Sequence, residues 1–475
     1  MARALRWLAA LLLLGLLAAG VAAFVLQQQS VTPRALAPYI EKRSSGHNPL
    51  ITGLGQWSAD LLVRLDRGDV VGGAPAIGGV GARAAAVPAP AAGTVRLVST
   101  SDDARRALAE AAPGDVITFL PGVYRFERTP LTAGRAGTAL APIVVRAAAP
   151  GSVTIEMDLA EGFQVSAPHW YFENLTIRGT CKVQANCEHA FHVVGAAADF
   201  RARNNTIVDF NAHFKINGMR GQFPDHGRIE DNTLRNDSVR ETMNPVTLID
   251  LVAASHWRIR RNQISDFVKG SGDRISYGAF AKGAGSDNIF EQNLVLCEAR
   301  LQGLPGQRVG LSLGGGGTGK DYCRDKRCIV EQEKSEIRAN LISACSDDGI
   351  YINSAAASKV THNTLLDTGG IQVRFPASSA DIEGNLIDGD IRARNGGAVR
   401  LIDNKTTPIA LLYAGYHPVR SLFANPAAFN FSWSGEPPRR ERGADFVPDL
   451  CGAVRATTLS YGAFDDIAAC FVQKD

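Results

Sequence analysis

Three features that would point to common functional classes are missing from this sequence. The net charge is small, because 50 Lys and Arg residues against 47 Asp and Glu residues give a formal charge of +3 over 475 residues. This balance argues against nucleic acid as a partner. The cysteine spacings C-x5-C and C-x4-C lack a histidine at the distance that zinc sites use, which argues against zinc. The repeated segments lack apolar residues at i, i+3 and i+4, which excludes helical repeats.

What the sequence does contain is one short unit used nine times. Each copy is a strand-like run that ends in an asparagine followed by a mostly apolar stretch, and successive asparagines are 19 to 47 residues apart. The copies read WYFENLTI, FRARNNTI, GRIEDNTL, WRIRRNQI, NIFEQNLV, SEIRANLI, SKVTHNTL, ADIEGNLI and VRLIDNKT, with asparagines Asn174, Asn205, Asn232, Asn262, Asn293, Asn340, Asn363, Asn385 and Asn404. Self-similarity of this kind is typical of a solenoid.

The units alternate apolar and polar residues and are rich in Gly, Asn, Asp and Thr, so each unit is expected to be a set of short strands joined by turns. Asparagine tolerates the left-handed backbone conformation at a turn, and stacked copies can join their side-chain amides from coil to coil. We therefore predict an all-β fold, a right-handed parallel β-helix. A β-sandwich is the alternative, but its strands do not usually repeat one turn signature nine times.

The N-terminus predicts export. Arg3 and Arg6 precede an uncharged apolar run from Trp7 to Leu26, which is about the length that crosses a bilayer. Residues 1–28 are therefore expected to be a signal peptide or a signal anchor. The small residues Val21-Ala22-Ala23 favour cleavage, whereas the length of the run favours retention and a membrane tether. In both cases the rest of the chain is expected to be periplasmic or extracellular.

All eight cysteines follow the apolar run, and an even number suits an oxidising compartment. Cys181 with Cys187 would close a small loop, and Cys323 with Cys328 another. Cys451 with Cys470 would hold the C-terminal tail. Cys297 and Cys345 lie four and five residues after turn asparagines, so a disulfide between coils is expected there.

The remaining chain divides into three parts. Residues 29–93 are predicted to be a juxtamembrane segment, with an amphipathic helix near Gly55 to Leu65, followed by a linker rich in Ala, Gly, Pro and Val. Residues 94–420 are predicted to form the β-helix. Residues 421–475 lack repeats and are predicted to be a C-terminal cap.

The start of the predicted β-helix resembles a known family. The stretches GTVRLVSTSDDARRALAEAAPGDVITFLPGVYRF and GTALAPIVVRAAAPGSVTIE are similar to the N-terminal cap and first coils of the chondroitinase B and alginate lyase family, polysaccharide lyase family 6. In physical terms, Ser101-Asp102-Asp103 would cap an amphipathic helix through Ala111, and Pro113-Gly114 would end it. The resemblance implies an exported pectin lyase-like β-helix that covers its open end with a helix.

Aligning the coils on their strands predicts which side chains stand in a row. The aligned segments are HVVG from 192, KING from 215, DLVA from 250, FAKG from 280, SLGG from 312, YINS from 351, QVRF from 372 and RARN from 392. Because strand side chains change sides at every residue, two columns face outward. One column is His192, Lys215, Asp250, Phe280, Ser312, Tyr351, Gln372 and Arg392. The other is Val194, Asn217, Val252, Lys282, Gly314, Asn353, Arg374 and Arg394.

These columns suit an acidic polysaccharide. Basic side chains would attract an anionic polymer, and Phe280 and Tyr351 offer faces on which sugar rings can lie. The expected substrate-binding residues are Lys215, Asn217, Asp250, Asn353, Arg374, Arg392 and Arg394.

Lyase chemistry on uronates needs a base for the proton beside the carboxylate and cations that stabilise the developing charge. Lys282 is the candidate base, helped by Tyr351 and Arg308, because FAKGAGSDNIFEQN is similar to the family's segment in which a lysine on a strand precedes an asparagine turn. The chain departs from the family in two places. Gly314 occupies the slot of the family's catalytic arginine. Ile275 and Tyr277 stand where its calcium-binding acidic pair belongs, so no metal or other cofactor is expected.

Other readings remain open. Asp347 and Asp348 precede the strand that contains Tyr351, and a carboxylate pair beside a β-helix groove resembles pectin hydrolases, whose activity resides in acidic residues. Pro224-Asp225-His226 is similar to a fragment of the mannuronan epimerase motif. A non-catalytic glycan-binding or envelope-assembly protein would use the same columns without turnover. The glycines Gly314 to Gly317 precede no helical pattern, so they are not expected to form a phosphate loop. They would instead let a loop or a ligand approach the backbone closely.

Overall fold

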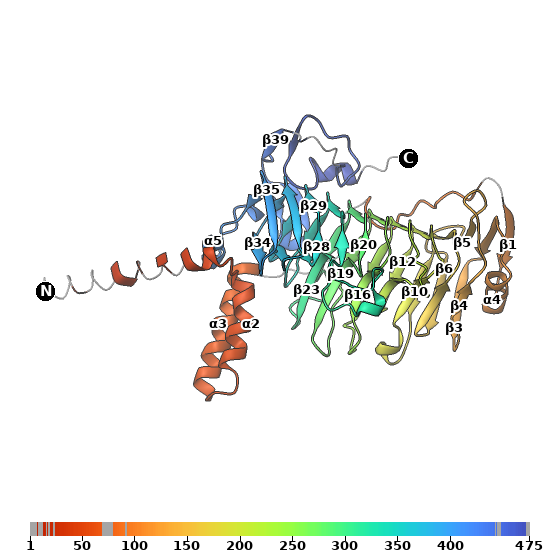
Figure 1. Ribbon diagram of the computed structural model, residues 1–475, viewed down its shortest axis with the longest axis horizontal. Helices are drawn as coiled ribbons and strands as arrows, with labels where there is room; N and C mark the ends of the chain where they lie inside the picture. Colours follow the sequence, from red (N-terminus) through yellow and green to blue (C-terminus); the bar gives the residue numbers. More distant parts are fainter. Residues whose placement is uncertain are drawn as a thin grey trace.

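The computed structural model describes residues 7, 13–15, 17, 20–21, 24–68, 79–90, 93–441, 443 and 448–471. Three long sheets of parallel strands surround one core (Figure 1). Hydrogen-bonded neighbours in each sheet come from successive turns of the chain, so the chain coils around one axis. The fold is a parallel β-helix, which confirms the sequence prediction.

The twelve-stranded sheet forms the first face, and its strands alternate buried and half-exposed residues, as in the pattern of β8. In order its strands are β1 (Thr94–Val98), β2 (Asp115–Phe119), β5 (Ile143–Ala147), β8 (Trp170–Glu173), β11 (Arg201–Arg203), β14 (Arg228–Glu230), β17 (Arg258–Arg260), β21 (Ile289–Glu291), β25 (Glu336–Arg338), β29 (Ser358–Thr361), β32 (Ser379–Glu383) and β35 (Ala398–Ile402). Its outward residues are largely charged and pair between coils, for example Arg338 with Glu291 at 2.8 Å.

The eleven-stranded sheet forms the second face. Its strands are β3 (Gly122–Glu127), β6 (Val153–Asp158), β9 (Thr176–Gly179), β12 (Thr206–Val208), β15 (Thr233–Arg235), β18 (Gln263–Ser265), β22 (Leu294–Leu296), β26 (Leu341–Ser343), β30 (Thr364–Leu366), β33 (Leu386–Ile387) and β36 (Lys405–Thr406). The strands β22, β26, β30 and β33 are buried on both sides. The outward side is covered by the chain's terminal segments.

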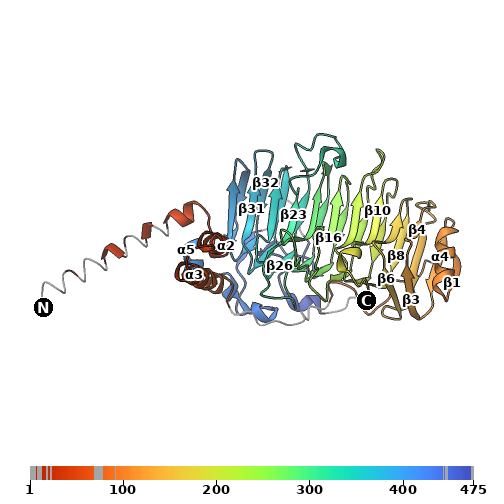
Figure 2. The ribbon, with the colours of Figure 1, turned by 90° about the horizontal axis from the view of Figure 1, so that it is seen from below.

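The ten-stranded sheet forms the third face, along the upper side of Figure 2. Its strands are β4 (Leu131–Ala133), β7 (Glu161–Val165), β10 (His189–Val194), β13 (Ala212–Asn217), β16 (Val246–Val252), β19 (Ile275–Lys282), β23 (Gln307–Leu313), β27 (Ile350–Asn353), β31 (Gly370–Arg374) and β34 (Asp390–Arg394). Inward side chains stack from coil to coil. The rings of Phe163, Phe191 and Phe214 lie in successive coils with centroids 5.1 Å apart.

A ladder of asparagines runs along the junction between the twelve-stranded and eleven-stranded sheets. The Oδ1 of each asparagine accepts hydrogen bonds from the backbone N–H and the side-chain amide of the asparagine one coil earlier, at 2.8 to 3.1 Å. Its members are Asn205, Asn232, Asn262, Asn293, Asn340, Asn363, Asn385 and Asn404. The predicted bonding of amides between coils is confirmed.

Two details of the asparagine prediction were wrong. Asn174 is not in the ladder, because Leu175 holds that position in its coil and donates its N–H to Asn205. The left-handed backbone falls on the residue before each ladder asparagine, as at Asn204 (φ 58°) and Asp231 (φ 55°). The ladder asparagines are therefore selected for their amide groups, which replace backbone partners at the turn.

Helices lie at both ends of the solenoid. At the N-terminal end, α4 (Ser101–Ala109) packs Ala104, Ala107 and Leu108 into the core. Its N-cap is Thr100, which accepts from the N–H of Asp103, one residue earlier than the sequence predicted. At the other end lie α5 (Ile409–Tyr413) and a hairpin of α2 (Pro33–Ser44) and α3 (Pro49–Arg67) (Figure 1). Helix α3 contains the predicted amphipathic helix.

The residues between the hairpin and the solenoid were expected to form a linker. Those that the structure describes, 79–90, instead lie along the solenoid and bind it by hydrogen bonds. The N–H of Arg83 donates to Asn204, and the N–H of Val87 donates to Asn174. Residues 79–90 thus run along the turns from the coil of Arg261 back to the coil of Arg146.

The C-terminal segment covers the later coils of the eleven-stranded sheet. Its regular parts are β37 (Phe423–Asn425), β38 (Asn430–Trp433), β39 (Arg439–Glu441), β40 (Thr458–Ser460) and the 3-10 turns η3 (Arg420–Leu422), η4 (Pro426–Ala428) and η5 (Ile467–Cys470). Phe423, Phe431 and Phe464 form one buried cluster with the outward leucines of β22, β26, β30 and β33. The boundaries 94–420 and 421–475 stay predictions.

All four expected disulfides are present: Cys181–Cys187, Cys297–Cys345, Cys323–Cys328 and Cys451–Cys470. They are consistent with an oxidising compartment. Half of the apolar run from Trp7 to Leu26, predicted to be a signal or an anchor, lies outside the described residues. Within the described ranges, no helix is both long and apolar enough to span a bilayer.

The ladder predicts a position-dependent loss of stability. Asn293→Ala removes an amide that bonds both neighbouring coils and leaves buried partners such as the N–H of Asn262 unsatisfied, so we expect a loss of about 3 kcal/mol. Asn404→Ala, on the half-buried last rung, is the matched control, with an expected loss of about 1 kcal/mol. Urea unfolding followed by circular dichroism measures both. Equal losses would contradict a ladder that acts between coils.

Candidate functional site

The outward face of the ten-stranded sheet has the register that the sequence predicted. Lys215 pairs with Asp250, Asp250 with Phe280, Phe280 with Ser312 and Ser312 with Tyr351 in successive strands. The last coils continue with Gln372 and Arg392. The intervening apolar residues are buried in the core, except in the last coil, where Ile391 is half-buried and Ala393 is exposed. The predicted columns are therefore real rows of side chains, one coil or about 4.8 Å apart.

Lys282 lies in the middle of this face. Its Nζ is 4.4 Å from the ring centroid of Phe280, and its stem packs against Gly315, where a Cβ would approach Lys282 to 2.8 Å. A Cβ on Gly316 would approach the side-chain amide nitrogen of Asn353 to 2.9 Å. The glycine run thus lets a loop lie against two side chains of the face, as expected for glycines that permit close approach.

Tyr351 and Arg374 form a pair two and three coils beyond Lys282. Their side chains are hydrogen-bonded, and Arg374 also donates to Asn395 at 3.0 Å and lies over the ring of Phe375. Burial raises the pKa of Tyr351 above its usual value, which outweighs the opposing effect of the Arg374 hydrogen bond. The hydroxyl therefore keeps its proton at neutral pH.

The cations of the face fall into two groups. Lys215 is paired with Asp250 at 2.7 Å, and Arg392 is ion-paired with Asp348, both side chains being buried. Within the described part of the chain, Lys282, Arg374 and Arg394 have no carboxylate at ion-pair distance. These three belong to one column, with Gly314 and Asn353 between them.

Asp347 and Asp348 lie at the start of β27. Burial raises the pKa of both carboxyls, that of Asp348 to about 7, although Arg392 opposes the shift. Asp347 raises the pKa of Asp348 further. Tyr277 is near both carboxyls. Burial raises the pKa of Tyr277, and the charges of Tyr351, Asp347 and Asp348 raise it further. The sequence had not placed Tyr277 in this group.

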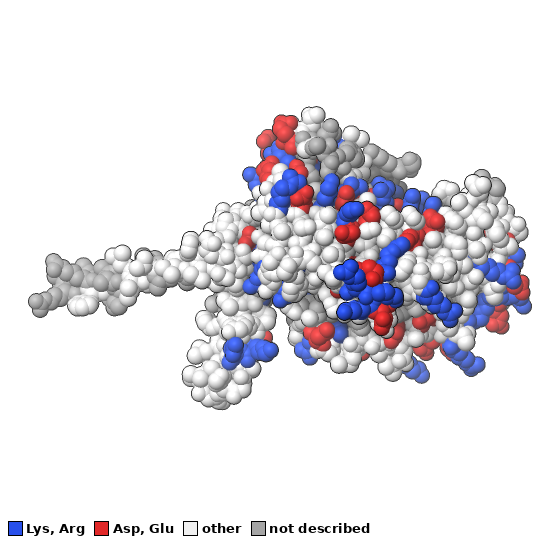
Figure 3. Space-filling model, in the orientation of Figure 1, with Lys and Arg blue, Asp and Glu red and all other residues white. Residues whose placement is uncertain are grey.

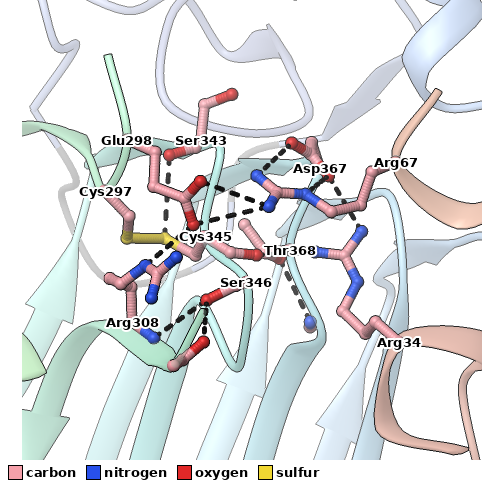
Figure 4. Close-up of a disulfide and its surroundings, with 12 residues drawn as sticks. Arg34, Arg67, Cys297, Glu298, Arg308, Ser343, Cys345, Ser346, Asp367 and Thr368 are labelled. Atoms are coloured by element: carbon pink, nitrogen blue, oxygen red, sulfur yellow. Dashed lines mark hydrogen bonds and ion pairs between the residues drawn. A yellow bond between two sulfur atoms is a disulfide. The ribbon is translucent and has the colours of Figure 1, made fainter. Parts of the chain in front are cut away.

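Arg308, expected to help Lys282, lies elsewhere. Its side chain is 1% exposed, donates to Glu298 at 2.8 Å and bonds the carbonyls of Leu304 and Pro305. Figure 4 shows it beside the Cys297–Cys345 disulfide, at the edge of the solenoid where the N-terminal hairpin docks. We therefore correct that expectation: its donors are used inside the protein, and it has no role on the outer face.

Sequence reasoning also missed a polar cluster nearer the N-terminal end of the face. His192 lies 2.9 Å from Glu161 and 2.9 Å from Asn217, on three successive strands. His189 is next to it, and burial, with His192 and Lys215, lowers its pKa to about 4. The alignment had placed His192 on the face but gave no partner for it, because Glu161 lies one coil before the first aligned segment.

A loop between β23 and β24 (Gln332–Glu333) forms one rim of the face. It contains η2 (Lys320–Tyr322) and the Cys323–Cys328 disulfide. Its Arg324 binds Asp225 at 2.8 and 2.9 Å and lies over Phe223, which packs against the cluster of Val252, Ala253 and Phe280. Asp225, the acidic residue of the epimerase-like fragment, is thus engaged in holding the loop.

The same rim is basic. Figure 3 shows Lys and Arg gathered over the middle of the solenoid, where Figure 1 places this loop, and Lys320, Lys326 and Arg327 are exposed on it. Within the described ranges, no group of three or more His, Cys, Asp or Glu side chains is placed to hold a metal ion.

Comparison with known proteins identifies the architecture. No protein-family model matches the chain, and no curated protein matches it in sequence. Among solved structures it is similar to the pectate lyase Pel9A, with 14% identity, a TM-score of 0.54, and coverage of 76% of this chain and 90% of that one. The shared feature is the fold. At this identity the likeness extends to the parallel β-helix and not to the chemistry.

Two other solved structures are similar to this chain at equally low identity and with lower TM-scores. An alginate lyase from Paenibacillus sp. str. FPU-7 is 13% identical, with a TM-score of 0.37 and coverage of 66% of this chain and 99% of that one. The mannuronan C-5 epimerase AlgE4 A-module of Azotobacter vinelandii is 12% identical, with a TM-score of 0.38 and coverage of 66% and 93%. The resemblance of the first coils to polysaccharide lyase family 6 stays a prediction.

The Arg392–Asp348 pair predicts a pH-dependent effect on stability. Because the folded pKa of Asp348 is above its unfolded value, its carboxyl is protonated below about pH 7 and ionised above it. Arg392→Met then leaves a buried carboxylate unpaired at pH 8, so we expect a loss of about 3 kcal/mol there and a smaller loss at pH 5. Thermal unfolding at both pH values measures this. Arg394→Met, two residues along the strand and exposed, is the control. A pH-independent loss would contradict the assignment.

Proposed function

We propose that this is an exported protein that binds an acidic, uronate-containing polysaccharide along the outer face of its ten-stranded sheet. The observation that carries the proposal is the column in which Lys282, Arg374 and Arg394 stand without carboxylate partners. Unpaired cations in a row suit a polymer with regularly spaced carboxylates. Export is supported by the four disulfides and by the apolar N-terminal run.

The spacing of the column suits several sugar units. Lys282 and Arg374 are three coils apart, or about 14 Å, and Arg394 is one coil further. Between them the column has only Gly314 and Asn353. Because Gly315 and Gly316 lie against Lys282 and Asn353, a sugar ring would bind beside this loop, with Lys282 and Phe280 on one side and Asn353 and Tyr351 on the other. Asn217 and the paired Lys215 and Asp250 would contact the polymer further along.

At this ring the proposed reaction is lyase-type β-elimination. The Lys282 amine would take the proton from the carbon beside the carboxylate, a double bond would form, and the bond to the glycosidic oxygen would break. Tyr351 keeps its proton at neutral pH and would give it to the leaving oxygen. Arg374, bound to Tyr351, would hold the carboxylate.

A second candidate is hydrolysis at Asp347 and Asp348, favoured by the raised pKa of Asp348. A carboxyl that titrates near neutral pH suits general acid catalysis. Against it, the Asp348 carboxyl is buried and paired with Arg392, and hydrolysis needs two carboxylates facing each other across a bond.

The test is incubation of the full chain with alginate, chondroitin, dermatan and pectate, followed by absorbance near 232 nm and by size chromatography. We expect a rise in absorbance that Lys282→Ala lowers by about a thousandfold. Lys42→Ala, an exposed lysine on α2, is the matched control and should leave the rate unchanged.

The other outcomes separate the alternatives. Shortening of the polymer without absorbance, lost in Asp348→Asn, would replace elimination by hydrolysis. Retention on a polyuronate column without turnover, weakened by Lys282→Ala and Arg374→Ala, would keep the binding site and remove the reaction. Neither retention nor turnover on any acidic polymer would overturn the proposed function.

A further inference from the structure

The N-terminal hairpin exposes an apolar stripe that nothing in the described part of the chain covers. Leu50, Leu54, Trp57 and Leu61 on α3 are exposed by 72%, 57%, 59% and 37%. Their spacing of four, three and four residues places them on one face of the helix. In Figure 3 the hairpin surface is almost free of charge apart from a small basic group.

The stripe is on the opposite side of α3 from its packed face. Gly55, Ala59 and Asp66 are buried, and a Cβ on Gly55 would overlap Ser44, the last residue of α2. With α3 held against α2 by small residues, the large apolar side chains all point away from the partner helix. A soluble hairpin would carry polar residues there, so the stripe indicates a partner.

The hairpin is bound to the solenoid by ion pairs and hydrogen bonds, so the orientation of the stripe relative to the solenoid is fixed. Arg34 bonds Asp66, the carbonyl of Cys345 and Asp367, and Arg67 reaches Glu298 and Asp367 (Figure 4). His417 donates to the carbonyl of Leu65 at 2.9 Å. These groups are largely buried. In Figures 1 and 2 the hairpin lies across the solenoid axis at the C-terminal end.

The chemistry around the stripe is that of a membrane surface. Trp57 and Tyr39 are exposed aromatic residues of the kind that lie at the level of lipid headgroups. Lys42, Arg43 and Arg64 are exposed on the same two helices and suit anionic lipid. Just before the hairpin the chain is apolar, and its described residues Leu13, Leu14, Leu17, Phe24 and Val25 are exposed by 50% to 69%.

We propose that α3 is an interfacial helix that lies in the surface of an anionic bilayer, with Leu50, Leu54, Trp57 and Leu61 in the acyl boundary. Continuity with the exposed apolar residues before α2 favours lipid over a protein partner. Because the hairpin lies at the C-terminal end of the solenoid, that end would be the one nearer to the membrane. This inference is independent of the reaction on the sheet.

The test reads Trp57 in the full-length chain. Trp170 and Trp257 are buried in the solenoid, Trp433 is packed on Phe423 in the C-terminal segment, and a Trp7→Phe background removes the tryptophan of the apolar run. The protein is incorporated into vesicles of phosphatidylethanolamine with a minority of phosphatidylglycerol, with or without brominated acyl chains. Trp57→Phe in the same background gives the contribution of Trp57 by difference.

We expect brominated lipid to quench about half of the Trp57 emission, since interfacial helices lie about 5–10 Å deep. Leu54→Lys with Leu61→Lys should remove that quenching. Leu140→Lys, at a fully exposed leucine in the N-terminal part of the solenoid, should keep it. Vesicle-bound protein whose Trp57 is untouched by brominated lipid would overturn the inference. Protection of Trp57 that depends on protein concentration without lipid would also overturn it, and would assign the stripe to a second copy.

Discussion

The hydrogen bonds between stacked asparagine amides are the constraint on which the rest of this structure depends. Each amide joins its own turn to the turns before and after it, so a coil cannot slip along its neighbour without breaking buried bonds. In a sheet, a slip of one residue would exchange the inner and outer faces. The ladder, from Asn205 to Asn404, therefore determines which side chains stand in the outer columns, although it contributes no residue to them.

The terminal segments decide which outer face is left for a ligand. The eleven-stranded sheet is covered by the C-terminal segment, and residues 79–90 lie along the row of turns that begins at Asn174. The twelve-stranded sheet uses its outward charges in pairs between coils. On the ten-stranded sheet, Lys282, Arg374 and Arg394 have no carboxylate partner within the described residues, and the loop held by Arg324 forms one of its rims.

The sequence was sufficient for features that repeat. Alternation along strands predicted both outer columns because every coil supplies the same pattern, and so Lys282 and Tyr351 were placed correctly on the face. The sequence was insufficient where a single contact determines the position of a residue or segment. The ion pair with Glu298 holds the Arg308 side chain away from the outer face, and no periodicity of the sequence predicts that pairing. The route of residues 79–90 depends on side chains 87 and 121 residues away, Asn174 and Asn204, whereas their composition alone suggested a linker.

The N-terminal hairpin, which is synthesised first, docks on coils and on a C-terminal segment that are synthesised last. Leu65 and its partner His417 are 352 residues apart, and the groups that receive Arg34 and Arg67 come from the coils that are synthesised late. A chain that emerges N-terminus first can pair Arg34 with Asp66 inside the hairpin, but it must leave Arg67 without Glu298 and Asp367 until most coils are stacked. The complete ion-pair network can therefore form only when the solenoid is almost finished. A chain truncated before these coils would expose charged groups that are buried in the full-length protein.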